Sequence, residues 1–82
     1  MPDIKKTDLR NAVFVTAHNS GGLNDETQRG IDAFDPSTYR HFLMIALEKR
    51  EHADRTGEDG GGINSAVYIR EAIDNLEYIL SH

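Results

Sequence analysis

Glu48 and His52 are the residues whose spacing comes nearest to a metal site. They are four residues apart, so in a helix both side chains would lean toward one point, where they could bind a metal ion. Zinc requires three or four donors, the sequence has no H-E-x-x-H motif, and the di-iron pattern needs Glu-x-x-His on two helices. We interpret Glu48 and His52 as a solvent-facing pair and expect no metal site.

A second candidate is the glycine run Gly60-Gly61-Gly62, which precedes a predicted helix start. Backbone amides in such a run could hold a phosphate or another anion. The run has no Gly-Lys-Ser/Thr motif, and Glu58 and Asp59 would repel the anion. An EF-hand alignment fails because Val67 or another non-ligand takes the place of the bidentate glutamate. We interpret the run as a connector and keep anionic-ligand binding at Gly60-Gly62 as an alternative.

Catalysis has less support than either of these sites. His18-Asn19-Ser20 would need a third group and an oxyanion hole, and no serine lies in a G-x-S-x-G turn. The sequence contains no cysteine, which excludes a thiol nucleophile, a disulfide framework and a thiolate metal site. We expect no enzymatic activity and no cofactor.

Two long helices must position these residues. Asp35-Pro36 is a helix-start signal, and the apolar arc that follows predicts a helix over 36–55. Asn64 or Ser65 can cap a second helix over 64–81, one face of which is apolar throughout: Ala66, Ile69, Ala72, Ile73, Leu76, Ile79 and Leu80. A loop of about eight residues allows the two helices to pack antiparallel as a hairpin.

The first third of the chain gives conflicting signals. Residues 12–16 have the β-branched content of a strand, but no other segment offers a strand partner, so we predict a helix over 9–18 with Thr7 or Asp8 as cap. Gly21 would take the left-handed conformation after this helix. A further short helix is expected over 24–34, with Asn24 as cap.

The predicted fold is therefore all-α: a small helical bundle built on the hairpin of 36–55 and 64–81, closed by one or two shorter N-terminal helices. The 82 residues form a single domain, 1–82, with flexible glycine-containing loops near 19–23 and 56–63.

The best candidate site is a stripe on the outer face of the last helix. Val67, Glu71, Asp74 and Tyr78 follow one another at i, i+4, i+7 and i+11. Two carboxylates framed by an aliphatic and an aromatic side chain could dock a protein with a basic patch. The competing interpretation is an ordinary exposed face on which Val67 and Tyr78 lie against the N-terminal segment.

Net charge limits the choice of partner. Fourteen acidic against nine basic residues give a net charge of −5, and the basic residues Lys49, Arg50 and Arg55 are scattered among acids, so we expect no nucleic-acid partner. No apolar run approaches the roughly 20 residues that span a bilayer, and we expect a cytoplasmic protein with no membrane association. The leading hypothesis is a non-catalytic protein-binding module, an adaptor or inhibitor-like regulator. The alternative is a self-assembling helical protein, with a homodimer as its simplest form, in which the 66–80 stripe packs between copies.

Overall fold

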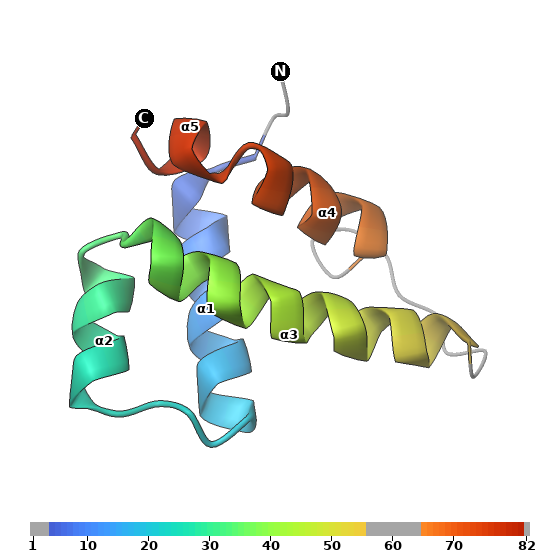
Figure 1. Cartoon of the computed structure of the whole chain (residues 1–82), viewed down its shortest axis with the longest axis horizontal. Helices are drawn as coiled ribbons and strands as arrows, with labels where there is room; N and C mark the ends of the chain where they lie inside the picture. The colour runs from blue at the N-terminus through green and yellow to red at the C-terminus, as the bar shows by residue number, and fades with distance from the viewer. Residues whose placement is uncertain (1–3, 56–64, 82) are drawn as a thin grey trace.

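The computed structural model describes residues 4–55 and 65–81, and in these ranges the chain is all-α, as predicted (Figure 1). Five helices pack against one another as a small bundle. They are α1 (Lys6–Asn19), α2 (Asp25–Asp32), α3 (Pro36–Arg55), α4 (Ala66–Asp74) and α5 (Leu76–Leu80). The loop predicted at 56–63 lies outside the described residues.

The α1 helix resolves the conflict in the first third in favour of a helix. Leu9, Val13 and Ala17 are buried at helical spacing, so tertiary packing outweighs the strand propensity of the intervening residues. The helix begins three residues earlier than predicted, after Lys5, and has no side-chain cap. Its C-terminal end is as expected, because Gly21 has φ +76 and its amide and that of Gly22 satisfy the last carbonyl groups.

The α2 helix is short and begins with a reciprocal cap. The Asn24 side chain accepts a hydrogen bond from the Thr27 amide at 2.9 Å, and the Thr27 hydroxyl accepts one from the Asn24 amide at 2.8 Å. Gly30 faces α3 so closely that a Cβ there would lie 2.4 Å from Thr38 Oγ1. Glycine in this helix therefore allows α2 to approach the start of α3.

The turn from α2 to α3 contains the one non-glycine residue with positive φ among the described residues. Phe34 has φ 54, and Asp35 donates its amide to the Gly30 carbonyl at 2.9 Å. This geometry normally favours glycine, and a residue with a Cβ costs about 1 kcal/mol there. Asp35 caps α3 as predicted, since its carboxylate accepts hydrogen bonds from the Thr38 amide at 3.0 Å and the Thr38 hydroxyl at 2.9 Å.

The helix predicted over 64–81 is interrupted at Asn75. Ser65 caps α4 by accepting from the Tyr68 amide at 3.1 Å, as predicted, and α4 runs back across α3 to form the hairpin (Figure 1). At Asn75 the side-chain amide donates to the Glu71 carbonyl at 2.8 Å, and the backbone leaves the helical conformation with φ −116 and ψ 19. An asparagine side chain that bonds the main chain in this way competes with helix continuation.

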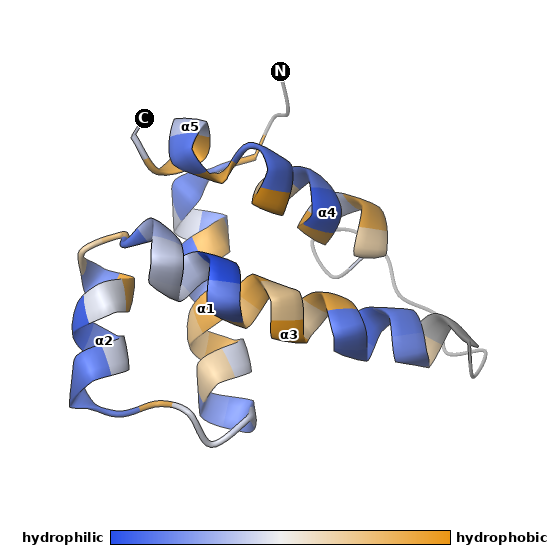
Figure 2. Cartoon of the chain, viewed as in Figure 1, coloured by the Kyte–Doolittle hydropathy of each residue, from blue (hydrophilic) through white to orange (hydrophobic). Residues whose placement is uncertain are grey.

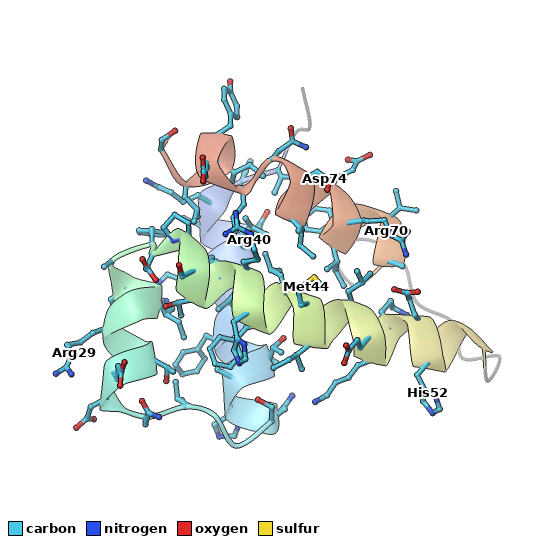
Figure 3. All side chains as sticks on the ribbon, in the orientation of Figure 1. Arg29, Arg40, Met44, His52, Arg70 and Asp74 are labelled. Carbon is cyan, nitrogen blue, oxygen red and sulfur yellow. The ribbon has the colours of Figure 1, made fainter. Side chains whose placement is uncertain are left out.

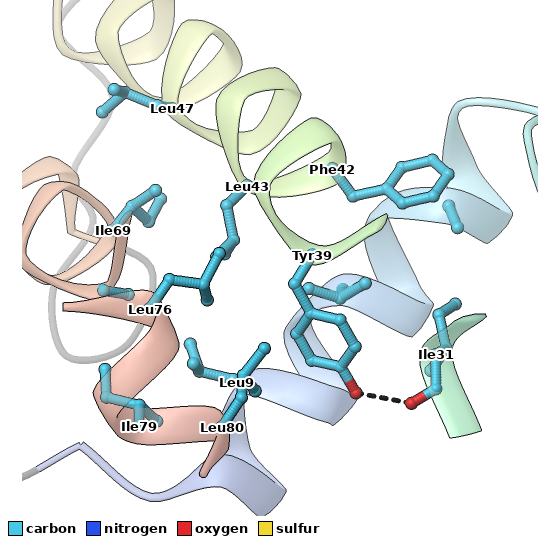
Figure 4. Packing of buried hydrophobic residues seen from close by; sticks show 13 residues of the cluster. Leu9, Ile31, Tyr39, Phe42, Leu43, Leu47, Ile69, Leu76, Ile79 and Leu80 are labelled. Carbon is cyan, nitrogen blue, oxygen red and sulfur yellow. Dashed lines mark hydrogen bonds between the residues drawn. The ribbon is translucent and has the colours of Figure 1, made fainter. Parts of the chain in front are cut away.

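The core draws residues from every helix (Figure 4). Figure 2 shows the apolar residues of α4 on the side that faces α3, and Leu76, Ile79 and Leu80 of α5 are buried as well. Tyr39 is fully buried, and its hydroxyl donates to the Ile31 carbonyl at 2.7 Å, which ties α3 to α2. Burial raises the pKa of Tyr39 to about 12.

Candidate functional site

All four residues of the predicted stripe are exposed, but they no longer form one line. Val67, Glu71 and Asp74 lie on α4, whereas Tyr78 lies on α5, beyond the interruption at Asn75. Val67 is 68% exposed, the most exposed large hydrophobic residue of the described chain, and Tyr78 is 45% exposed. Whether these residues bind a partner stays a prediction.

The surface around them has two separate hollows. One, of about 340 Å³, is lined only by residues of α4: Ala66, Val67, Arg70, Glu71 and Asp74. The other, of about 320 Å³, is lined by residues 4–7, Ile79 and Tyr78. Tyr78 therefore borders the N-terminal segment, as the competing interpretation expected, whereas Val67 does not line that hollow.

Arg70 directly precedes Glu71 in the sequence but is paired with a residue of α3 (Figure 3). Its guanidinium contacts the Glu51 carboxylate at 3.2 Å, which links α4 to α3. The side chains of Glu71 and Asp74 make no ion pair within 4–55 and 65–81. The α4 hollow thus presents two carboxylates and an exposed valine together with Arg70, whose charge is paired with Glu51. The two carboxylates and the valine are suited to a basic partner segment.

We define the α4 face as Val67, Glu71 and Asp74. These residues belong to the side of α4 opposite Ile69 and Ala72, which are buried against the rest of the bundle. The buried side chains of Ile69 and Ala72 and the Ser65 cap hold the α4 face in place, whereas the Arg70–Glu51 pair is well exposed and adds little stability. A helix anchored in this way gives its outward side chains fixed relative positions.

The residues considered for other chemistry are not brought together. Glu48 and His52 are both exposed on α3 (Figure 3 labels His52), and within the described ranges no three histidine, aspartate or glutamate side chains are placed to share a metal ion. His18 contacts Asn19 at 3.4 Å and Ser20 donates to the Ala17 carbonyl at 3.3 Å, so both serve the end of α1. The Gly60-Gly62 run lies outside the described residues.

The apolar stripe that motivated the self-assembly alternative is used within the chain. Ile69, Ala72, Leu76, Ile79 and Leu80 are all buried. The interruption at Asn75 contributes to this burial, because it allows α5 to pack against the core in a direction different from that of α4. Ala66 and Ile73, the other two residues of the stripe, are partly buried, and self-assembly of the chain stays a prediction.

One feature escaped the sequence analysis: a cavity between α1, α3 and α4. It measures about 310 Å³, and Tyr68 forms part of its wall. The Tyr68 hydroxyl is out of contact with solvent and has no hydrogen-bond partner. The sequence signal was slight, since Tyr68 is simply the residue next to Ile69 on the apolar side of the helix.

The electrostatics of the rest of the surface are ordinary. Arg10 contacts Asp32 at 2.7 Å between α1 and α2, and this hydrogen bond, with a second from Gln28, lowers the pKa of the Asp32 carboxyl. Both side chains of the pair are well exposed, so the contact adds little stability.

Comparison with protein-family models, curated proteins and solved structures finds no match to this chain. In the part of the chain that the structure describes, none of the helices combines the length and apolarity needed to cross a bilayer.

Proposed function

We propose that this chain is a non-catalytic protein-binding module that contacts its partner through the α4 face. The observation that supports the proposal is the exposure of Val67 at 68% beside two exposed carboxylates on the same helix. Burial of an aliphatic side chain would supply binding free energy, and Glu71 and Asp74 would select a partner segment rich in lysine or arginine.

Charge complementarity favours a basic protein as the partner. The chain carries a net charge of −5, which attracts a basic protein over a distance and speeds association. Arg70, the cation nearest in sequence, is held by Glu51 and leaves the two carboxylates available. Tyr78 would extend the contact only for a partner large enough to cover both hollows.

The test compares three forms of the protein in affinity capture followed by titration. The first is the wild type, the second is Glu71→Lys with Asp74→Lys, and the third is Glu26→Lys with Glu48→Lys. The third is the control, because it makes the same charge change at two exposed acidic positions away from the α4 face. Circular dichroism checks that all three are equally helical.

The proposal expects a stoichiometric basic protein that is retained by the wild type and by the control. Its affinity for the Glu71→Lys, Asp74→Lys variant should be at least tenfold weaker, because two favourable charge contacts become repulsive. Equal affinity for all three forms would show that the α4 face is not the binding surface. Equal loss from both variants would show that only net charge matters.

A further inference from the structure

The cavity between α1, α3 and α4 adjoins a second hollow. The cavity measures about 310 Å³ and the hollow about 230 Å³, and both are lined by Thr16, Ala46 and Ile69. The three helices can be followed in Figure 1, where α3 crosses in front of α1 and α4 runs above α3. We call the cavity and the hollow together the α1–α3–α4 groove.

The cavity end of the groove is apolar. Its wall includes Leu9, Ala12 and Leu43, and none of its described wall residues is charged. Thr16, a polar wall residue, already donates its hydroxyl to the Ala12 carbonyl at 2.8 Å within α1. Val15 also belongs to the wall and is 54% exposed. An alkyl chain in the cavity would therefore gain free energy by covering Val15 and displacing water from an apolar wall.

The hollow end of the groove is basic. Lys49 and Arg50 are the charged residues among its described wall residues. Lys49 is exposed and forms no ion pair with the described side chains. Of the acidic residues beside these two in the sequence, Glu51 contacts Arg70 at 3.2 Å, and Glu48 does not line the hollow. The hollow thus offers a positive charge at the end of an apolar cavity.

We propose that the α1–α3–α4 groove binds a medium-chain fatty acid, with the alkyl chain in the cavity and the carboxylate beside Lys49. A ligand with an apolar body and one anionic end matches the order of an apolar wall followed by a basic one. Val67, Glu71 and Asp74 line a different hollow, so the proposal does not depend on the proposed function.

The size of the groove sets the length of the ligand. An apolar cavity of about 150 Å³ holds the six carbons of benzene, so about 310 Å³ has room for a chain of about eight to ten carbons. The adjoining hollow leaves space for the carboxylate. The net charge of −5 opposes the approach of an anion, so most of the affinity must come from burial of the alkyl chain.

The test uses three probes with the same eight-carbon chain: octanoate, octan-1-ol and octylammonium. Binding is followed by the ¹H–¹⁵N spectrum of the full chain. We expect octanoate to shift the amide signals of Ala12, Ala46 and Ile69, with a dissociation constant on the order of 1 mM for a ligand of this size. Octylammonium should bind at least fivefold more weakly at these residues, because Lys49 repels it. Each methylene added between octanoate and decanoate should strengthen binding about fourfold, because the chain is buried.

A charge reversal decides whether Lys49 holds the carboxylate. Lys49→Glu should weaken octanoate about tenfold, because an attractive contact becomes repulsive, and should leave octan-1-ol unchanged. Lys5→Glu is the matched control, since it makes the same charge change at an exposed lysine that lies outside the groove. It should bind both probes as the wild type does.

A second variant decides whether the groove holds the chain. Ala46→Leu places a larger side chain in the wall that the cavity and the hollow share, and it should abolish binding of both octanoate and octan-1-ol. Ala33→Leu, the same change at an exposed position beside α2, is the control and should bind as the wild type does.

Three results would overturn the proposal. The first is the absence of shifts in the groove at ten times the expected dissociation constant of octanoate. The second is an equal effect of Lys49→Glu and Lys5→Glu, since that would show that only net charge matters. The third is a shift of the same amides when the free protein is diluted, since that would show that a second copy of the chain covers the groove. Lys49→Glu changes an exposed side chain, so it keeps the test valid even if Ala46→Leu does not fold.

Discussion

Replacing Tyr39 with phenylalanine removes one hydroxyl group from a fully buried position at the junction of α2 and α3. The hydroxyl donates to the Ile31 carbonyl at 2.7 Å, and that carbonyl also accepts from the Phe34 amide at 3.2 Å. In the variant the Ile31 carbonyl would keep its hydrogen bond from the Phe34 amide. The variant therefore loses one net hydrogen bond and leaves the buried carbonyl only partly satisfied. We expect the free energy of unfolding to fall by about 1 to 2 kcal/mol.

Tyr68→Phe is the matched control for this prediction. It makes the same chemical change at a buried hydroxyl that has no hydrogen-bond partner, so it should leave stability unchanged or raise it by up to about 1 kcal/mol. Urea unfolding followed by circular dichroism at 222 nm measures both variants. If the two variants were destabilised equally, the hydrogen bond would not be what stabilises the α2–α3 junction.

The pH dependence of stability gives a second measurement on Tyr39. Its pKa is about 12 in the folded chain against about 10 for an ordinary tyrosine, so the folded state holds a proton that the unfolded state releases between these values. Stability is therefore fully present below pH 10 and falls as pH rises from 10 to 12, by roughly 2 to 3 kcal/mol. The Tyr39→Phe variant should lose most of this slope. If stability of the Tyr39→Phe variant fell as steeply between pH 10 and 12 as that of the wild type, groups other than Tyr39 would be responsible for the pH dependence.

Two backbone positions offer further predictions. Gly30→Ala should destabilise the chain by about 1 to 3 kcal/mol, although alanine normally favours a helix, because its Cβ would meet Thr38 Oγ1 at 2.4 Å. Adding Thr38→Ala should restore part of the Gly30→Ala loss in a double-mutant cycle, and strict additivity would contradict the clash. At Phe34, where φ is 54, the glycine variant should be about 1 kcal/mol more stable than the alanine variant in thermal unfolding. The opposite order would argue against the left-handed turn.

Local signals in the sequence were sufficient to predict most helix ends. Asn24, Asp35 and Ser65 cap helices because their side chains each accept a hydrogen bond from the amide three residues later, and this chemistry needs no tertiary information. Gly21 ends α1 for a similar local reason. The all-α fold followed from these caps together with the spacing of apolar residues.

The interruption at Asn75 and the turn at Phe34 could not be predicted in the same way. Asparagine is tolerated inside many helices, and here the outcome depends on how well α5 packs as a separate element. Phe34 takes a conformation that suits glycine because its ring lies 5.9 Å from that of Tyr39 and the Lys6 amine lies 4.7 Å from its ring centre. Both results depend on contacts between distant segments.

For the candidate site, helical spacing alone predicted the exposure of Val67, Glu71 and Asp74. The prediction placed Tyr78 on the same line because it assumed a continuous helix, whereas the interruption at Asn75 puts Tyr78 on α5. The cavity at Tyr68 depends on the relative placement of three helices, which no local pattern specifies.

The position of α3 has a consequence for how the domain comes apart. This helix contacts each of the other four helices, including α1, which lies about thirty residues earlier in the sequence. The ends of the bundle, α2 and α5, can in principle open while the rest stays folded, as local units of a protein often do. The middle of α3 cannot unfold locally in this way, because α1, α2, α4 and α5 would then all lose their contacts with α3. Its central amides, around Leu43, should exchange with solvent only when the whole domain unfolds.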